Sequence, residues 1–480
     1  MSISKAPLVV DLDGTLIATD TLAESVVKLI KRSPLNLFRL FFWLLRGRAS
    51  LKSQVAALVE LDASRLPYRQ ELLAYVKAER AAGRKIVLAT AAHESIASRV
   101  ASHLGLFDLV LATKGSRNLK GDEKLKAIRS EVGERFSYAG DSATDLPVWC
   151  AAESALLVGV SNTVAKSVRA KNTLIEREFA VDSGEFGTWL KALRVHQWVK
   201  NSLLFVPFFL AFGYVDPFEL VWLVIAFFAF SFVASATYVV NDLWDLDNDR
   251  GHPRKCKRPF ASGALSIPRG LAVSGALLVT GFGAALVVTP AFCLMLLVYL
   301  VVTSAYSWFL KGYVLMDVMS LSVLYTLRIL AGALASTATI SSWLLAFSVF
   351  MFLSLALVKR CGELVSLEAA GGEATTGRDY RVTDLAVLWP LGVGAALSAV
   401  VVFGLFISSP DTTNRYGAPE LLWLAALGLI YWLARLWIKT SRGEMHDDPV
   451  AYAIKDRGSR ITVLFMLGIV LLAHSLHIPL

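Results

Sequence analysis

Long apolar segments separated by polar connections occupy the second part of the chain. Most of the segments approach the roughly 20 residues that a helix needs to cross a bilayer. The first is short and is expected to begin further back, near Gln197. The pattern predicts an all-α, nine-helix transmembrane bundle over residues 203–480. The nine predicted segments are 203–214, 218–240, 271–289, 291–307, 314–335, 341–358, 384–407, 420–438 and 460–477.

The connections between these segments alternate in charge. Four are rich in charged residues, whereas the others are short or nearly free of Lys and Arg, with Arg415 as the main exception. Because basic connections stay on the inner side of a membrane, all four are expected in the cytosol, and the C-terminus outside. This predicts a multi-pass protein of the inner (cytoplasmic) membrane. The four charged connections are 241–269, 308–313, 359–383 and 439–459.

The first part of the chain shows a different pattern, in which short apolar runs alternate with helical stretches. This alternation predicts a parallel, doubly wound α/β sheet over residues 1–175. Residues 16–84 are helical in character, as expected of a cap, and residues 176–202 read as a linker that becomes an amphipathic juxtamembrane helix. The predicted strands are 7–12, 85–89, 109–112, 137–139 and 155–160, the last of these being the final strand.

One segment within the predicted cap, Pro34 to Arg48, is unusually apolar. Its sequence, PLNLFRLFFWLLRGR, has a dense apolar face surrounded by arginines. It is too short to span a bilayer. Two interpretations remain: a helix buried in the cap, or a helix that lies in the headgroup layer.

Composition narrows the class of protein. Hydrophobic residues make up 55% of the 480 residues, and the mean hydropathy is +0.55, which is typical of a membrane protein. The net charge of +9 is modest and is explained by inner-facing loops, so no nucleic-acid partner is expected. The four cysteines have neither metal-site nor redox spacing. The N-terminal apolar run is broken at once by Asp11 and Asp13, so no secretory signal is expected and the first domain should stay in the cytosol.

An acidic stretch follows the second predicted membrane helix. If the helix continues into water, Asn241, Asp242, Asp245 and Asp249 fall within about one third of its circumference. Asp247 falls on the opposite side. Carboxylates grouped in this way suit Mg²⁺ bound to a substrate phosphate. The basic run from Arg254 to Arg258, which includes Lys255, suits the phosphates themselves.

Four motifs occur in order in the first domain, and together they resemble the haloacid dehalogenase (HAD) superfamily of phosphohydrolases. They are DLDGT, a strand ending at Thr90, a helix start with Lys124, and GDSATD. The resemblance implies that Asp11 is the nucleophile, Asp13 the general acid and base, and Thr90 and Lys124 the phosphoryl ligands. It also implies an Mg²⁺ site formed by Asp11, Asp13, Asp141 and Asp145. Lys120 and Lys114 are alternatives to Lys124.

Further basic residues lie on the predicted cytosolic connections and are candidate phosphate ligands. Arg328 lies inside a predicted membrane helix, so it should face the bundle interior and either a partner, for which Asp317 is a candidate, or a ligand. The remaining candidates are Arg258, Lys311, Lys359, Arg360, Lys455 and Arg457.

The membrane region resembles the UbiA superfamily of prenyltransferases. The family's NDxxDxxxD motif is intact from Asn241 to Asp249, but KRCGE, Lys359 to Glu363, replaces the second acidic motif. Several segments look like decaprenyl-phosphate phosphoribosyltransferases, including HPRKCKRPFASG, YSWFLK, KRCGEL and DPVAYAIKDRGS. That resemblance implies Mg²⁺-dependent transfer of phosphoribose from 5-phosphoribosyl diphosphate (PRPP) to a polyprenyl phosphate.

These patterns lead to one expected function and to alternatives. We expect a bifunctional membrane enzyme in which the membrane domain makes polyprenylphosphoryl-5-phosphoribose and the HAD domain removes the 5-phosphate. The first alternative is transfer of a prenyl chain from a prenyl diphosphate to a small aromatic acceptor, with the HAD domain acting on another phosphate ester. The second keeps the phosphoribosyl transfer and gives the HAD domain a soluble sugar phosphate. The third is a transporter or scaffold without turnover.

Overall fold

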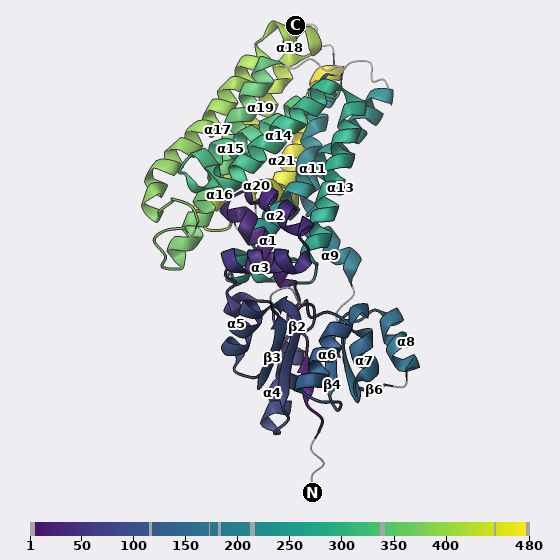
Figure 1. The fold of residues 1–480 in the computed structure, drawn as a ribbon. Helices are drawn as coiled ribbons and strands as arrows, with labels where there is room; N and C mark the ends of the chain where they lie inside the picture. Colours follow the sequence, from purple (N-terminus) through teal and green to yellow (C-terminus); the bar gives the residue numbers. More distant parts are fainter. Residues whose placement is uncertain are drawn as a thin grey trace. The chain divides into compact units, whose positions relative to one another are not determined.

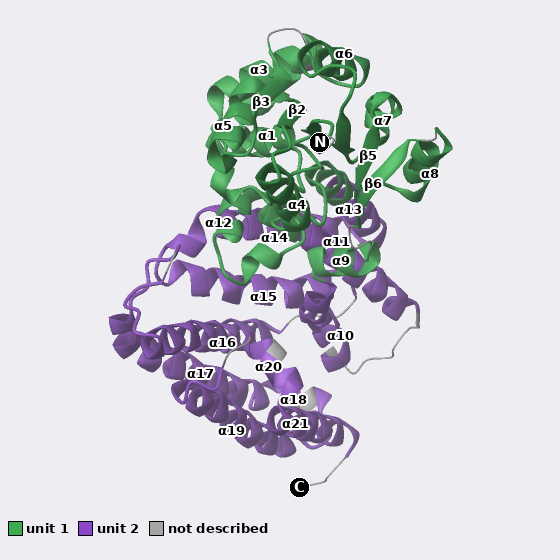
Figure 2. Ribbon diagram, turned by 90° about the horizontal axis from the view of Figure 1, so that it is seen from below, with its two compact units in different colours: residues 1–194, 238–274 green, residues 195–237, 275–480 purple. Residues whose placement is uncertain are grey.

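A computed structural model describes residues 5–114, 118–171, 173–180, 184–211, 217–336, 341–375, 377–445 and 448–476. The chain forms two compact units (Figure 2). Residues 1–194 and 238–274 form the first, and residues 195–237 and 275–480 form the second. The acidic stretch therefore packs with the N-terminal α/β domain. The predicted domain boundaries at residues 175 and 202 follow sequence character and stay a prediction.

The first unit contains a six-stranded parallel sheet with the order β3-β2-β1-β4-β5-β6 (Figure 1). In the central strand, Val9 pairs with Val87 on one side and with Tyr138 on the other. Successive residues point to opposite faces, so Leu8 and Val10 pack into one core and Val9 into another. The strands are β1 (Leu8–Val10), β2 (Ile86–His93), β3 (Leu109–Thr113), β4 (Ser137–Gly140), β5 (Ser154–Val158) and β6 (Leu174–Phe179).

The five predicted strands are confirmed, but the prediction that residues 155–160 form the last one is wrong. Strand β6 follows and pairs with β5 at the edge of the sheet. Its sequence, LIEREF, carries three charged residues, and most of its side chains are at least partly exposed. An edge strand tolerates such polarity because one side meets solvent. The same polarity made the segment read as part of a linker.

Helices cover both faces of the sheet. Leu72 of α4 and Val100 of α5 join one core, whereas Ile128 of α6 and Trp149 of α7 join the other. This arrangement confirms the predicted doubly wound domain. The helices are α4 (Gln70–Ala81), α5 (Glu94–Leu104), α6 (Asp122–Glu131), α7 (Leu146–Ala151) and α8 (Asn162–Ala170), with the 3₁₀ turns η1 (Ala63–Arg65) and η2 (Ala143–Asp145).

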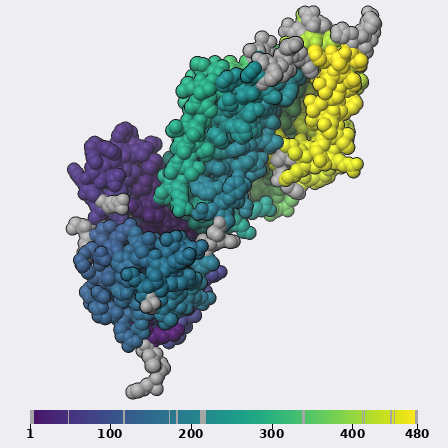
Figure 3. Space-filling view, turned by 90° about the vertical axis from the view of Figure 1, so that its right-hand side faces the viewer, coloured from purple at the N-terminus to yellow at the C-terminus, as the bar shows by residue number. Residues whose placement is uncertain are grey.

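Three further helices, α1 (Thr21–Arg32), α2 (Asn36–Leu45) and α3 (Arg48–Leu58), form the predicted cap; these N-terminal residues have the purple end of the colour scale in Figure 3. Leu29, Val55 and Val59 form its own small core. Helix α2 exposes Phe38 (69%), Phe41 (61%) and Phe42 (62%). The interpretation of this segment as a buried cap helix is therefore wrong, and the open apolar face fits a helix in the headgroup layer.

Residues 238–274 belong to the first unit because their apolar side chains pack against Ala192 of that unit. Val239, Leu243, Phe260 and Ile267 form one cluster with Ala192. The elements involved are α9 (Glu185–Ala192), the end of α11 (Pro217–Trp244), α12 (Leu246–Arg250), η4 (Lys255–Lys257) and the start of α13 (Ile267–Val288).

The second unit is helical. Its main core lies among α15, α16, α17 and α19 and includes Tyr325, Leu357 and Leu433. Gly332 allows close packing, because a Cβ there would stand 1.9 Å from the Leu204 carbonyl oxygen. Besides parts of α11 and α13, the unit contains η3 (Val195–Phe205), α10 (Val206–Ala211), α14 (Pro290–Trp308), η5 (Leu310–Gly312), α15 (Met316–Leu334), α16 (Ser342–Ala369), η6 (Val382–Asp384), α17 (Leu385–Ile407), α18 (Pro410–Arg415), η7 (Pro419–Leu421), α19 (Leu422–Ser441), α20 (Pro449–Lys455) and α21 (Arg457–Ser475).

Eight of the described helices are long and apolar enough to cross a membrane. Eight of the nine predicted spans correspond to them. The prediction of a ninth span at 203–214 is not supported, because residues 195–211 form a 3₁₀ helix followed by a short α-helix, and residues 212–214 lie outside the described residues. The polar residues Lys200 and Asn201 precede this segment and leave too few apolar residues for a full span.

Candidate active sites

The motif residues of the first unit gather at one edge of the parallel sheet. Asp11 follows β1, Thr90 lies in β2, and Asp141 follows β4. The strand order reverses at β1: β2 and β3 lie on one side of it, and β4, β5 and β6 lie on the other. Ligands of open α/β sheets bind at such a point, beyond the carboxyl ends of the strands. The fold thus brings together residues that are up to 130 positions apart in the chain (from Asp11 to Asp141).

Lys124 connects the carboxylates of this site. Its Nζ lies 3.1 Å from Asp11 Oδ1 and 3.3 Å from Asp145 Oδ1, and it donates to the Tyr138 hydroxyl at 2.8 Å. The Tyr138 hydroxyl in turn donates to Asp145 at 2.8 Å. Lys124 is buried, whereas the alternatives Lys114 and Lys120 are exposed. Of the three lysines considered, Lys124 is the one that contacts Asp11.

Three carboxylates at this edge fit a divalent cation. Oxygens of Asp11, Asp141 and Asp145 lie within 4.8 Å of one another. Asp11 Oδ1 is buried and accepts no hydrogen bond of good geometry within the described part of the chain. Burial raises the pKa of Asp11 to about 6 against the opposing charge of Lys124, and burial with repulsion from Asp11 raises the pKa of Asp141 to about 7. An added cation would offset this repulsion, and Mg²⁺ prefers such oxygen ligands.

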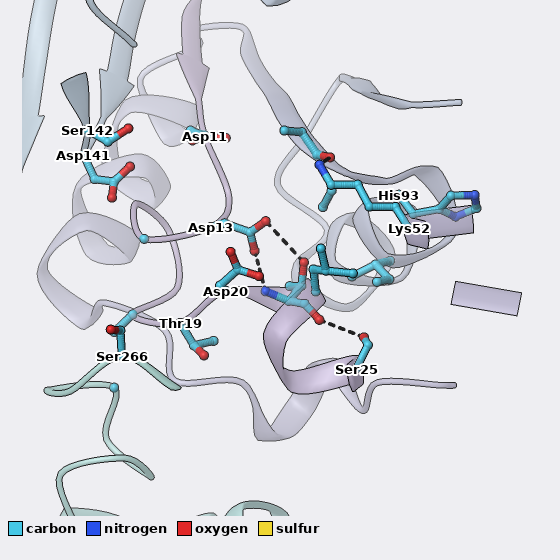
Figure 4. Close-up of a pocket in the computed structure, with 18 of the residues that line it drawn as sticks. Asp11, Asp13, Thr19, Asp20, Ser25, Lys52, His93, Asp141, Ser142 and Ser266 are labelled. Carbon is cyan, nitrogen blue, oxygen red and sulfur yellow. Dashed lines mark hydrogen bonds between the residues drawn. The ribbon is translucent and has the colours of Figure 1, made fainter. Parts of the chain in front are cut away.

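Asp13 lies apart from the three carboxylates and faces the start of α1. It accepts hydrogen bonds from the Thr21 backbone nitrogen at 2.9 Å and from the Thr21 hydroxyl at 3.3 Å (Figure 4). Burial and repulsion from Asp20 raise the pKa of Asp13 to about 8. A carboxyl group that keeps its proton near neutral pH suits proton donation. The predicted roles of Asp13 in acid–base chemistry and as a metal ligand both stay predictions.

Gly14 allows the DLDGT turn to pass close to Asp141. Its φ is +75°, and a Cβ at this position would stand 2.2 Å from Asp141 Oδ2. The left-handed conformation strains any other residue, and the contact would displace one of the three carboxylates.

We expect Gly14→Ala to lower phosphate release from an aryl phosphate by roughly 100-fold, because a shift of about 1 Å in a catalytic group costs that much. Gly83→Ala is the matched control, since Gly83 has a φ of +84° and nothing stands within 4 Å of its added Cβ. Steady-state rates, with thermal unfolding to confirm folding, check this prediction. Equal losses in the two variants would show that backbone strain and not the clash with Asp141 matters.

A cavity of about 510 Å³ extends from these residues towards the cap. Its walls include charged side chains that the sequence did not single out, notably Lys52 and Arg69. Arg69 donates to the Gly14 carbonyl oxygen at 3.1 Å, and Lys52 donates to Asn118 at 2.9 Å. No motif marks these two residues, because the cap segments that carry them approach the sheet only in the folded chain. Tyr138 was also missed, although its place three residues before Asp141 was a usable signal.

The acidic motif is mostly helical, but Asp245 interrupts the predicted continuous helix between α11 and α12. The Asp245 nitrogen donates to the Asn241 carbonyl oxygen at 3.0 Å, and the Asp249 nitrogen donates to that of Asp245 at 2.8 Å. Asp242 and Asp249 are buried, whereas the side chains of Asp245 and Asp247 are 29% and 39% exposed. The motif therefore presents two of its carboxylates to the interior.

Arg258 joins the two buried carboxylates. Its Nη1 lies 3.1 Å from Asp242 Oδ1 and 2.7 Å from Asp249 Oδ2. Arg194 contacts Asp242 at 2.5 Å. In this arrangement the two arginines neutralise the buried carboxylates, and the role of Asp242 and Asp249 in binding Mg²⁺ stays a prediction. Asp245 lies apart, 4.0 Å from Lys31, and the three predicted magnesium ligands do not form one group of oxygens in this structure.

Arg328 lies in the interior of the second unit, as predicted for a charge within a membrane helix. Its Nε donates to Asn201 at 3.0 Å and its Nη2 to the Tyr299 hydroxyl at 3.2 Å. Its guanidinium also lies 5.4 Å from the centre of the Tyr325 ring. The proposed pairing with Asp317 is wrong, because Asp317 pairs with Arg360 instead.

The segment that replaces the second acidic motif lies inside α16 and not in a connection. Arg360 is fully buried and pairs with Asp317 and Glu363, and the Tyr380 hydroxyl donates to Asp317. Lys359 lies 3.7 Å from Asp448, which Lys200 contacts at 2.8 Å. Arg360 is thus neutralised by protein groups. The other predicted ligands in this unit lie in η5 (Lys311, half-buried) and at α20 and α21 (Lys455 and Arg457, both exposed).

Two further predicted substrate ligands of the first unit, Lys255 and Asn241, differ in setting. Lys255 begins the 3₁₀ turn η4 and is exposed, and its backbone nitrogen donates to His252 at 3.4 Å. Asn241 is half-buried in the last turn of α11. Their roles as substrate ligands stay predictions.

Two regions of the chain each match a known protein family. Residues 202–473 match the UbiA prenyltransferase family, and residues 8–149 match the haloacid dehalogenase-like hydrolases. An uncharacterized protein of Sinorhizobium fredii, y4nM, is 40% identical over 461 residues, 95% of this chain and 88% of its own. The nodulation protein NoeC of Azorhizobium caulinodans is 35% identical over 290 residues, covering 60% of this chain and 94% of its own.

A named enzyme is also similar to the membrane region. The decaprenyl-phosphate phosphoribosyltransferase of Mycobacterium tuberculosis is 31% identical over 285 residues, covering 57% of this chain and 90% of its own. The UbiA match covers more than half of the chain, and the eight apolar helices lie in or close to it. The chain is a multi-pass membrane protein of the UbiA prenyltransferase family, with a haloacid dehalogenase-like hydrolase domain at its N-terminus.

Proposed function

We propose that this protein transfers 5-phosphoribose from PRPP to a polyprenyl phosphate and then removes the 5-phosphate, which yields polyprenylphosphoryl-ribose. The observation that carries the proposal is the loss of the second acidic motif, whose place is taken by Lys359–Glu363. A prenyl diphosphate needs only its diphosphate neutralised, whereas PRPP and the lipid acceptor bring two further phosphates. The similarity to a decaprenyl-phosphate phosphoribosyltransferase supports the same donor.

The transfer step needs no strong base. A phosphate oxygen of the lipid attacks C1 of the ribose, and the C1–O bond breaks as its electron pair leaves with diphosphate. Bound Mg²⁺ would neutralise the leaving diphosphate and would be held by Asp242 and Asp249. Asp245, which lies 4.0 Å from Lys31, would have to turn towards them to join this site. Basic side chains would hold the ribose 5-phosphate and the lipid phosphate. The candidates are Lys255, Arg258, Lys311, Arg328, Lys359, Lys455 and Arg457. Arg360 would bind a phosphate only by giving up its buried partners Asp317 and Glu363.

The hydrolysis step uses the pocket of the first unit. Asp11 attacks the phosphorus of the 5-phosphate, and Asp13 donates a proton to the sugar oxygen that leaves. Asp13 then takes a proton from the water that attacks the aspartyl-phosphate, which releases inorganic phosphate. Lys124 and Thr90 hold the phosphoryl oxygens. Asp11, Asp141 and Asp145 would hold Mg²⁺, which neutralises charge on the phosphoryl group.

Both reactions take place on the cytosolic side of the inner membrane in this proposal. The exposed apolar face of α2 would rest in the headgroup layer and bring the phosphatase to a lipid-borne substrate. Since one chain carries both sites, the product of the first reaction is present at a high effective concentration for the second.

The donor is tested with purified full-length protein, Mg²⁺ and a polyprenyl phosphate or a small aromatic acceptor. Labelled PRPP is expected to enter the lipid fraction, and labelled prenyl diphosphate is not. The reverse result would establish the prenyltransferase alternative. Absence of turnover with either donor would leave a transporter or scaffold.

A further inference from the structure

One wall of the phosphatase pocket comes from the region that matches the UbiA family. Gly263, Ala264, Ser266 and Arg269 line the cavity together with Asp11 and Asp13, and all of them belong to the first unit. Figure 4 shows Ser266 on the side of the cavity opposite Asp11. We call residues 259–269 the wall segment.

The wall segment is held tightly against the α/β domain. A Cβ on Gly263 would stand 2.3 Å from the Ala18 carbonyl oxygen, and its φ is +77°. Arg250 forms a bidentate pair with Glu24 of α1 at 2.9 and 2.6 Å, and its Nε donates to the Ala261 carbonyl oxygen at 3.0 Å. Both charged side chains are only 5% exposed. A buried, bidentate pair of this kind fixes geometry far better than a surface ion pair.

Helix α1 is shared between the pocket and the acidic motif. Its first residue, Thr21, holds Asp13, whereas Lys28 contacts Asp247 at 2.9 Å and Lys31 donates to the Trp244 carbonyl oxygen at 2.7 Å. Residues 244–250 are therefore fastened to α1 at several points, and Arg250 links them to Ala261 of the wall segment. The wall is a built part of the phosphatase pocket.

The cavity has two chemically distinct ends. Asp11, Lys124 and Asp141 form the end where a phosphoryl group reacts. The rest carries four cations and one carboxylate beside the apolar side chains of Leu22, Val55 and Ile96; the charged residues are Lys52, Arg69, Lys120, Arg269 and Asp20. A volume of about 510 Å³ exceeds the needs of a small phosphate ester and approaches that of drug-sized ligands. The leaving alcohol that fits best is one with a second anionic group and an apolar part.

Arg269 is the cation best placed for such an anion at the wall. It lies in the first turn of α13, a helix long and apolar enough to span a membrane, where lipid phosphates are found. Its protein partner is Glu185 at 3.3 Å, and both side chains are more than two-thirds exposed (68% and 67%). Exposed ion pairs of this kind are weak, so a substrate anion can replace Glu185.

We propose that the wall segment is the substrate-binding wall of the phosphatase and that Arg269 binds the phosphodiester of a substrate whose phosphomonoester lies at Asp11. The inference rests on the proposed hydrolysis step and names the group that selects its substrate. The membrane region thereby decides which phosphate esters the hydrolase domain accepts.

The test compares two soluble esters with the full-length protein and Mg²⁺. Ribose 1,5-bisphosphate has an anion at C1, and ribose 5-phosphate has none. Arg269→Gln is expected to raise KM for the bisphosphate about tenfold or more, with kcat little changed and KM for ribose 5-phosphate unchanged, because hydrogen bonds to charged groups have this strength. Arg129→Gln is the matched control, since Arg129 is an exposed arginine paired with Glu134 at 3.0 Å and does not line the pocket.

A second variant tests the wall without touching a charge. Gly263→Ala is expected to reduce the preference for the bisphosphate while hydrolysis of ribose 5-phosphate continues. Unchanged selectivity in both variants would overturn the inference and leave the proposed function intact. If wild-type protein hydrolyses neither ester in an Asp11-dependent way, the proposed hydrolysis fails and this inference fails with it. Preference for the lipid-linked substrate over the soluble bisphosphate, lost in Arg269→Gln, would identify the lipid diester as the anion.

Discussion

Asp11→Asn is expected to stop release of inorganic phosphate from the lipid product and to leave the transfer of phosphoribose intact. The amide cannot attack phosphorus, and removal of a catalytic nucleophile lowers rates by roughly 1,000-fold or more. Asn has almost the same volume as Asp, so the ion pair with Lys124 is lost without a change in packing. Mass spectrometry of the lipid fraction should show the phosphorylated sugar lipid accumulating in the variant.

Asp122→Asn is the matched control for this experiment. Asp122 is an exposed residue in the first turn of α6, two positions before Lys124, and its only expected effect is a loss of under about 1 kcal/mol of helix stabilisation. It should yield the dephosphorylated lipid, as wild type does. A wild-type product from Asp11→Asn would mean that the hydrolase domain does not act on this lipid, and a soluble sugar phosphate would become its better candidate substrate.

Asp242→Asn is expected to abolish formation of the sugar lipid itself. Asp242 is buried, contacts both Arg194 and Arg258, and provides one of the two carboxylates that would hold Mg²⁺. Loss of a metal-supported leaving group removes several kcal/mol of transition-state stabilisation, which is about 100-fold or more in rate. Incorporation of labelled PRPP into lipid measures the effect.

Asp247→Asn separates this role from a general loss of negative charge. Asp247 lies in the same segment, but its side chain is 39% exposed and contacts Lys28 at the surface. Surface ion pairs contribute under about 1 kcal/mol, so incorporation should stay near the wild-type level. Similar losses in both variants would show that the whole segment matters only for structure. Hydrolysis of ribose 5-phosphate should continue in both, which reports that the first unit is folded.

The motif residues of the hydrolase domain could be located from the sequence because each stands at the end of a recognisable apolar run. Asp11 follows PLVV, and Asp141 follows SYAG, and parallel strands place their carboxyl ends at one edge. Strand β6 could not be recognised, because an edge strand needs only one apolar side and its charges resemble those of a linker. Lys124 was recognisable by position, but its contact with both Asp11 and Asp145 depends on the packing of α6 against the sheet.

In the membrane region, too, some features could be predicted from the sequence and others depend on the folded structure. Helix length and hydropathy are local properties, so eight of the spans were predictable. Charge pairing is not local. Arg360 and Asp317 are 43 positions apart and pair in the interior, whereas Arg328 donates to Asn201. A buried charge must find a partner, but only the folded chain decides which partner comes within reach.

By itself, the sequence determined the two regions, their membrane or α/β character and the candidate residues for the chemistry, because periodicity and motif spacing are set along the chain. Only the tertiary structure decided that residues 238–274 pack with the hydrolase domain and that their wall segment lines its pocket. That outcome depends on contacts between distant segments, such as Arg250 with Glu24 and Gly263 with Ala18. Such contacts leave no periodic trace in the sequence of either segment, since each requires only one suitable side chain at one position.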